Sequence, residues 1–185
     1  GCIANVLPLA RGAEAVLPKD LVSLAVQIMA EHPWKVLAIE QNMLMMAEVT
    51  RTPALLLEFV QGDNVSTLCS FARSYFENPK VLQATALLLS QVASIKKGAT
   101  DLISRGVAGL LTRALHQHKI NASVVTGITG CLQCMALTKE LTQQMLTDGI
   151  LSTLFVLADM YYDNPSVLSN ILHVMATVAQ QGGVC

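Results

Sequence analysis

Apolar residues recur along this chain at the spacing of one helix face, in four similar copies. Counted from a common starting point, the positions three, ten, thirteen and fourteen residues on are apolar in every copy. Such spacings place side chains on one side of an α-helix. The fourteenth position is always alanine, which predicts a close helix crossing without room for a larger side chain. The starting points are Pro33, Pro79, Ala122 and Pro165, and the alanines are Ala47, Ala93, Ala136 and Ala179.

Three asparagines spaced 43 residues apart, Asn78, Asn121 and Asn164, predict where the long helices begin. Asparagine favours the N-cap because its side-chain oxygen accepts a hydrogen bond from an unpaired backbone N–H of the first turn. Proline suits the first helical position, and it follows two of these asparagines. His32-Pro33, 46 residues before Asn78-Pro79, is interpreted as an earlier, more divergent copy. Repeats of about 40 to 47 residues with two or three helices are typical of helical solenoids.

A second apolar stripe precedes each cap and predicts a middle helix, with Leu68 and Tyr75 among its members. A shorter helix comes before the middle helix in three copies. A glycine follows this shorter helix each time, at Gly62, Gly106 and Gly149. These glycines are predicted to be C-terminal caps that take positive φ. Each copy is therefore predicted to contain a short helix, a glycine, a middle helix, a capped turn and a long helix.

The sequence Gly-Val-Ala-Gly-Leu-Leu-Thr-Arg-Ala-Leu at 106–115, followed by an uncharged helix that ends in Leu132-x-x-Met135-Ala136, resembles the armadillo repeat. The resemblance covers residues 19–180 and implies an all-α fold, a right-handed α-solenoid of armadillo-like three-helix repeats. It also implies the boundaries of the copies within one continuous domain. These are 1–18 for a partial preceding repeat or N-terminal helix, 19–62, 63–106 and 107–149 for three repeats, and 150–185 for a truncated C-terminal repeat.

In armadillo proteins the long third helices line a concave groove that binds extended segments of partner proteins. The resemblance implies such a groove here, at the positions one, four, eight and twelve residues after the common starting points. Peptide-binding members carry tryptophan and asparagine at the eighth and twelfth positions, and neither ladder is present in this sequence. The candidate groove residues are Trp34, Leu37, Gln41, Met45, Lys80, Gln83, Leu87, Gln91, Ser123, Thr126, Gly130, Cys134, Ser166, Ser169, His173 and Thr177.

Composition narrows the classes of protein that this chain can belong to. With 52% apolar residues, 14% charged residues and a net charge of -1, it is neither a disordered chain nor a general binder of nucleic acid. The largest basic cluster, Lys96-Lys97 with Arg105, is interpreted as a solvated loop. The uncharged stretch 120–138 contains many polar residues, so we expect a buried repeat helix and no membrane insertion. An odd number of cysteines, five, and a start without a signal-peptide pattern predict an intracellular, cytoplasmic protein.

Candidate chemistry centres on Cys131-Leu-Gln-Cys134, with His116 and His118 upstream. Cysteine and histidine are the common zinc ligands, so these four residues suit a zinc site, and two cysteines three positions apart also suit a redox dithiol. The competing interpretation is that the cysteines are small buried apolar residues of a long helix. No serine or cysteine nucleophile lies in a catalytic motif, and no glycine-rich loop for phosphate is present. We therefore expect no enzyme activity, no catalytic residues, no metal site and no cofactor.

The pattern as a whole predicts a noncatalytic scaffold that binds a protein or peptide partner along the groove. Because the candidate groove residues are mostly small and uncharged, a segment with apolar anchors fits them better than a basic signal, with Trp34 and Leu87 as the anchoring residues. Two alternatives stay open. The chain is a structural spacer or self-association module, forming a homo-oligomer through exposed repeat ends. The weaker alternative is a zinc or redox-regulated dithiol module.

Overall fold

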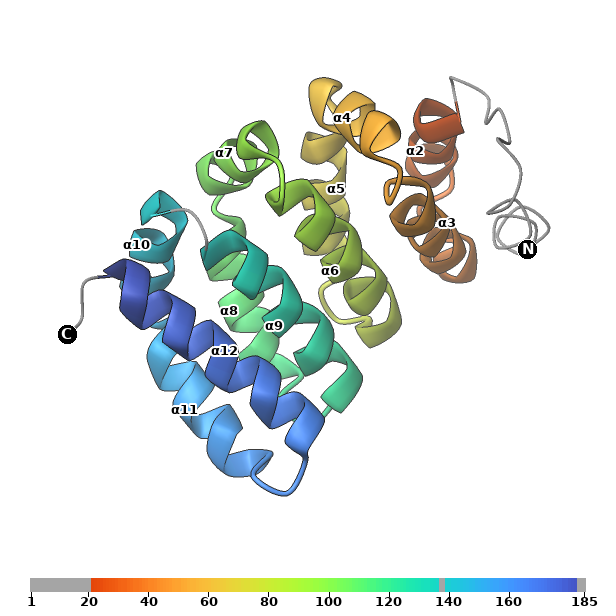
Figure 1. Ribbon diagram of the computed structural model, residues 1–185. Coiled ribbons are helices and arrows are strands. Elements are labelled where there is room, and N and C mark those ends of the chain that lie inside the picture. The colour runs from red at the N-terminus through yellow and green to blue at the C-terminus, as the bar shows by residue number, and fades with distance from the viewer. Residues whose placement is uncertain (1–20, 137–138, 183–185) are drawn as a thin grey trace.

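The computed structural model describes residues 21–136 and 139–182, and these form eleven α-helices without a β-strand (Figure 1). The prediction of an all-α fold is confirmed, and residues 1–18 lie outside the described residues. The helices are α2 (Leu21–Glu31), α3 (Val36–Val49), α4 (Pro53–Gln61), α5 (Asn64–Ser74), α6 (Pro79–Ala93), α7 (Lys96–Ser104), α8 (Val107–Gln117), α9 (Ala122–Ala136), α10 (Lys139–Thr147), α11 (Ile150–Met160) and α12 (Pro165–Gly182).

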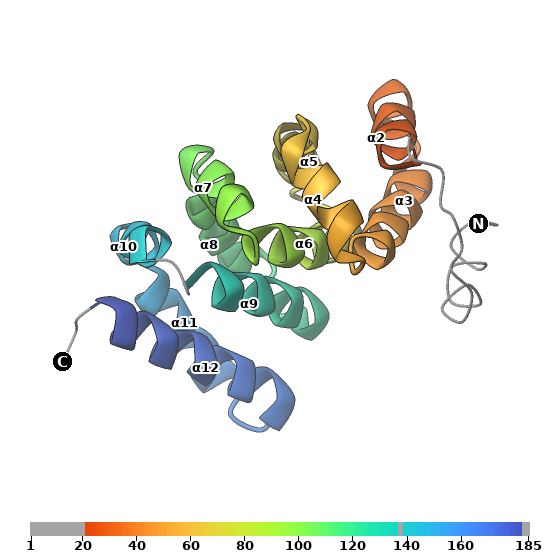
Figure 2. The same ribbon diagram turned by 45° about the horizontal axis from the view of Figure 1, so that its top comes forward.

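The helices follow one another in sets of nine, eleven and about fifteen residues: α4 to α6, α7 to α9, and α10 to α12, which ends in a helix of 18 residues. Within the layer of long helices α3 packs against α6, α6 against α9, and α9 against α12. Figure 2 shows these four helices side by side, with the shorter helices on the other side of the molecule. The core between the two layers is aliphatic. None of the helices in the described part of the chain combines the length and apolarity needed to span a bilayer.

The predicted asparagine caps are confirmed in the structure. The side-chain oxygen of Asn78 accepts hydrogen bonds from the backbone N–H groups of Lys80 and Val81, both at 3.1 Å. The oxygens of Asn121 and Asn164 each accept one bond from the third residue on, at 3.2 and 3.3 Å. These bonds satisfy first-turn donors that have no partner within the helix.

The glycine prediction holds at two of its three positions. Gly106 and Gly149 have φ of 64° and 74° and stand directly before α8 and α11. Gly62 has φ of -79° and an extended backbone, so its predicted positive φ is wrong. The reason is its position: Gly62 lies 44 residues before Gly106, and Asp63 occupies the place that precedes the middle helix.

The predicted start of the first long helix at Pro33 is also wrong, because α3 begins at Val36. The N–H of Lys35 donates to the carbonyl of His32 at 3.0 Å, as that of Asn78 does to Tyr75 at 2.9 Å. His32 is therefore the counterpart of Tyr75, and the repeat length is 43 residues here as well. An error of three residues is close to one helical turn, so the same helix face stays apolar and the pattern alone could not detect it.

One ladder of hydrogen bonds links each turn to the turn of the preceding set. The Tyr75 hydroxyl donates to the carbonyl of Pro33, and the Tyr161 hydroxyl donates to the carbonyl of Lys119 at 2.9 Å. Between them, Nε2 of His118 lies 2.8 Å from the carbonyl oxygen of Phe76. In each of the three bonds the two partners lie 42 residues apart in the sequence. The two tyrosines and the histidine of this column therefore have the same structural role, which is to link neighbouring turns.

Candidate functional site

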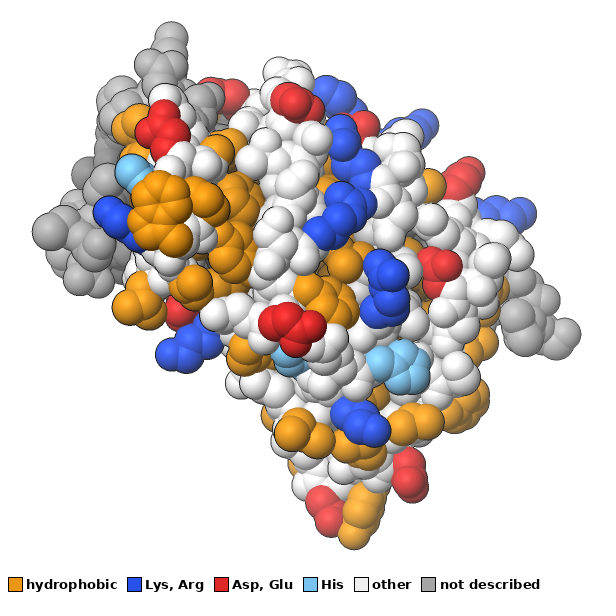
Figure 3. Space-filling model, turned by 180° about the vertical axis from the view of Figure 1, so that it is seen from behind, with side chains coloured by type: hydrophobic (Ala, Val, Ile, Leu, Met, Phe, Trp, Pro, Cys, Tyr) orange, Lys and Arg blue, Asp and Glu red, His pale blue; other side chains and the backbone are white. Residues whose placement is uncertain are grey.

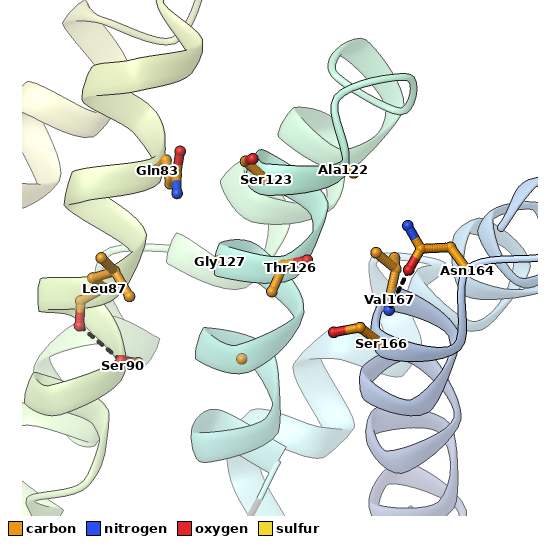
Figure 4. Close-up of a pocket in the computed structure, with 11 residues that line it drawn as sticks. Gln83, Leu87, Ser90, Ala122, Ser123, Thr126, Gly127, Asn164, Ser166 and Val167 are labelled. Atoms are coloured by element: carbon orange, nitrogen blue, oxygen red, sulfur yellow. Dashed lines mark hydrogen bonds between the residues drawn. The ribbon is translucent and has the colours of Figure 1, made fainter.

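The surface of the long helices contains a hollow of about 460 Å³ that is lined by residues of α6, α9 and α12 and by Asn164 before α12 (Figure 4). Most of its side chains are small, and none of them carries a charge. The side chains of Gln83, Ser123 and Ser166 make no hydrogen bond within the described part of the chain, so they can bond to a ligand. We call this site the central hollow; its lining residues are Gln83, Leu87, Ser90, Ala122, Ser123, Thr126, Gly127, Gly130, Asn164, Ser166 and Val167.

Two glycines of α9 shape the central hollow. A Cβ at Gly127 would lie 3.6 Å from Cγ of Gln83 and 3.7 Å from Cβ of Ala86, so α9 lies close to α6 at this point. A Cβ at Gly130 would have no atom within 4 Å, so the surface is open there. The missing side chain at Gly130 therefore leaves room beside Leu87, which is 41% exposed.

A second hollow, of about 320 Å³, lies between α3 and α6. Leu87 lines both hollows, which joins them along the surface of the long helices. This second site, which we call the α3 hollow, carries the ion pair Glu48–Arg51, at 3.3 Å. Its lining residues are Gln41, Leu44, Met45, Ala47, Glu48, Arg51, Leu87 and Gln91.

Nine of the sixteen candidate groove residues line one of these hollows, and seven do not. Within the first group Met45 is 5% exposed, so it contributes little surface. Within the second group Thr177 is buried, and its hydroxyl donates to the carbonyl of His173 at 2.9 Å. The nine are Gln41, Met45, Gln83, Leu87, Gln91, Ser123, Thr126, Gly130 and Ser166. The seven are Trp34, Leu37, Lys80, Cys134, Ser169, His173 and Thr177.

Trp34 differs most from its predicted place. It stands in the turn before α3, and its ring packs edge-on against that of His32 with the ring centroids 5.5 Å apart. Its side chain is 69% exposed. Trp34 lines neither hollow and precedes α3, so its predicted place in the first turn of the long helix is wrong, and its role as an anchor stays a prediction.

The three-residue error of register hid other residues of the α3 hollow. With the repeat length of 43 residues, Leu44 is the counterpart of Leu87 and Glu48 is the counterpart of Gln91. Both Leu44 and Glu48 line the hollow. A search of the sequence for one constant repeat length would have found both residues. The structure supports a length of 43 residues, because the turns before α3 and α6 share the same hydrogen bond.

The Gln91 amide is occupied by contacts within the protein. Its Nε2 donates to the carbonyl of Ala47 at 2.8 Å, and its Oε1 accepts a hydrogen bond from the Thr50 hydroxyl. These bonds hold α6 against the end of α3. Gln91 therefore supports the site and is less available to a ligand than Gln83.

The candidate metal or redox residues make contacts of their own within the protein. Cys131 is fully buried, and its Sγ donates to the sulfur of Met135 at 3.8 Å. His118 bonds to the turn of the preceding set, while Nε2 of His116 lies 2.8 Å from the Thr153 hydroxyl. Across 21–136 and 139–182, no three His, Cys, Asp or Glu side chains gather closely enough to hold a metal ion.

Burial also governs the chemistry of the thiols. It raises the pKa of Cys69 from 9.0 to about 11, and it raises the pKa values of Cys131 and Cys134. Thiols with raised pKa values stay protonated near neutral pH and react slowly.

Comparisons with known proteins gave no match for this chain. No protein-family model matches it, and no curated protein has a matching sequence.

Proposed function

We propose that this chain is an armadillo-like, right-handed α-solenoid that acts as a noncatalytic protein-interaction module. In this proposal a segment of a partner protein binds along the surface of the long helices. The observation that carries the proposal is the pair of hollows that meet at Leu87. A half-exposed leucine between two hollows suits an apolar anchor of the partner, and the free polar groups around it suit the partner's backbone.

The character of the central hollow also indicates what drives binding. No lining side chain is charged, so burial of apolar surface and hydrogen bonds must contribute most of the affinity. The amide of Gln83 and the hydroxyls of Ser123 and Ser166 can bond to an extended backbone. We therefore expect a partner segment with an apolar residue at Leu87 and polar backbone contacts along α9 and α12.

Replacing Leu87 with aspartate is expected to weaken partner binding about tenfold or more, because it places a charge where the partner's anchor is buried. Tagged wild-type protein and Leu87→Asp would be used for affinity capture from cell extract, with bound proteins quantified by mass spectrometry. The partner segment identified in this way would then be titrated as a purified peptide. Its affinity should change less than about threefold between about 0.05 and 0.3 M salt.

Leu57→Asp is the matched control, because Leu57 in α4 is 46% exposed and lines neither hollow. Circular dichroism of both variants would show that the helices stay folded. Equal loss of the partner in the two variants, or an affinity that falls steeply with salt, would place the binding surface elsewhere.

A second candidate function is self-association through the face of α11 and α12. Phe155 is 62% exposed, whereas its counterpart 43 residues earlier, Thr112, is 5% exposed. Leu172 is 50% exposed, whereas its counterpart Thr129 is buried. The same columns are thus covered in the preceding set and left open in the last one. Apolar side chains exposed at the end of a stack of helices favour contact with further helices.

Light scattering over a range of protein concentrations tests this second candidate. Self-association predicts a molar mass that rises with concentration in the wild-type protein and stays at that of the monomer in Leu172→Glu. Leu57→Glu serves as the control, because it adds the same charge at a similarly exposed leucine. A wild-type protein that stays monomeric at all concentrations excludes this candidate and leaves the groove proposal intact.

A further inference from the structure

Basic residues are concentrated in the middle of the chain. Residues 63–119 contain seven lysines and arginines and three acidic residues, although the whole chain has a net charge of -1. Residues 21–62 and 139–182 each contain more acidic than basic residues. Figure 3, the view from behind, shows Lys and Arg side chains running down the middle of the molecule. This distribution favours a negatively charged ligand on the outer side of α5 and α8.

A hollow of about 550 Å³ lies within this basic region, between the C-terminal end of α5, the turn after it, and α8. Arg73 comes from α5 and Arg113 from α8, and both are exposed. Leu110, which is buried, and Phe76, which is half-buried, provide its apolar surface. Ser74, Glu77 and Gln117 complete the lining, so the site combines two cations with an apolar patch.

The two arginines are prepared for binding in different ways. One Nη of Arg73 donates to the carbonyl of Arg105 at 2.5 Å, which holds the guanidinium in place, and its other N–H groups have no partner among the residues that the structure describes. Arg113 makes no hydrogen bond or ion pair with any residue that the structure describes. Arg105 itself is engaged, because its guanidinium bonds to Ser66 at 2.9 Å.

The one acidic residue of the hollow, Glu77, has a neutral partner. The Glu77 carboxylate accepts a hydrogen bond from the Gln117 amide. Within the described ranges, Glu77 forms no ion pair with Arg73 or Arg113. A bound carboxylate would therefore meet two guanidinium groups whose charge is not already paired.

We propose that this hollow binds an acidic segment of a partner protein, with carboxylates at Arg73 and Arg113 and an apolar side chain against Phe76 and Leu110. Two arginines beside an apolar patch suit such a segment better than a nucleic acid, which requires a longer array of phosphate contacts. The site lies on the shorter helices, so the proposal does not depend on binding at the long helices.

The test is a fluorescence anisotropy titration at low salt with a labelled peptide of glutamate residues around one leucine. The wild-type protein should bind this peptide and should not bind the same peptide with glutamine in place of glutamate. Arg113→Glu is expected to weaken binding about tenfold or more, and Arg73→Gln about threefold to fivefold. Arg113→Lys should fall between the wild-type protein and Arg113→Glu, since lysine keeps the charge and loses the two-pronged geometry.

Lys35→Glu is the matched control, because it makes the same change of charge at an exposed residue before α3. Leu87→Asp, the groove variant, should bind the peptide as the wild-type protein does, which separates this site from the proposed function. Three results would overturn the proposal: no binding of the glutamate peptide, equal binding of the glutamine peptide, or an equal loss in Lys35→Glu and Arg113→Glu. Tighter binding of a short DNA duplex, lost in Arg113→Glu, would instead identify a nucleic-acid site.

Discussion

Replacing Ala136 with leucine is expected to destabilise the protein by about 1 to 3 kcal/mol, because the larger side chain must force neighbouring groups apart. Ala136 is fully buried at the end of α9. Its carbonyl also accepts a hydrogen bond from the Thr142 hydroxyl at 2.9 Å, which ties the end of α9 to α10. Equilibrium unfolding in denaturant, followed by circular dichroism, measures the loss directly.

Ala54→Leu is the control for this experiment, because Ala54 is exposed in the first turn of α4. Its effect should stay within about 0.5 kcal/mol, as for most surface substitutions. If Ala136→Leu shifts the free energy of unfolding by no more than this control, the alanine does not mark a tight helix crossing.

The asparagine caps and two of the four alanines were predictable from residue type and spacing. The alanine prediction fails in the first copy, where Thr50 is the counterpart of Ala93 at the repeat length of 43 residues, and Ala179 is only half-buried. Asn78 bonds to the N–H groups two and three residues on, so its role follows from residue type and position alone. Ala93 and Ala136 lie on the apolar face that the spacing defines, and both are buried. The all-helical fold and its repeated sets followed from the same local signals.

The register of the first long helix was not predictable in this way. The apolar stripe of a helix looks nearly the same after a shift of three residues, so Met46 fitted an apolar column in either alignment. The difference lies in a turn, where Lys35 takes the place of an asparagine cap and offers no side-chain acceptor. Sequence analysis therefore placed Trp34 on a helix that begins after it.

The candidate site also has features that the sequence predicted and features that it did not. The hollow around Leu87 was predictable in outline, because the period of the long helices brings Gln83, Ser123 and Ser166 to one surface. The engagement of the Gln91 amide was not, because its partners lie about one repeat away in the sequence. The hollow that contains Arg73 and Arg113 was not predictable either, because its two arginines lie 40 residues apart in the sequence. The interpretation of Lys96-Lys97 as a solvated loop is wrong, because the two lysines begin the helix α7.

Replacing Gly98 with alanine is expected to destabilise the protein by about 1 to 3 kcal/mol, although alanine favours a helix over glycine by about 1 kcal/mol. A Cβ at Gly98 would lie 2.2 Å from the carbonyl oxygen of Val92 and 2.8 Å from its Cγ1. Since only Ser94 and Ile95 separate α6 from α7, the start of α7 cannot move away without disturbing the end of α6.

Gly130→Ala is the matched comparison, because Gly130 also lies inside a helix and a Cβ there would meet no atom within 4 Å. This variant should stabilise the protein by about 0.5 to 1 kcal/mol through helix propensity alone. The two glycine-to-alanine changes are thus expected to shift the denaturation midpoint in opposite directions. If both variants are more stable than the wild-type protein, Gly98 does not lie as close to Val92 as the structure shows.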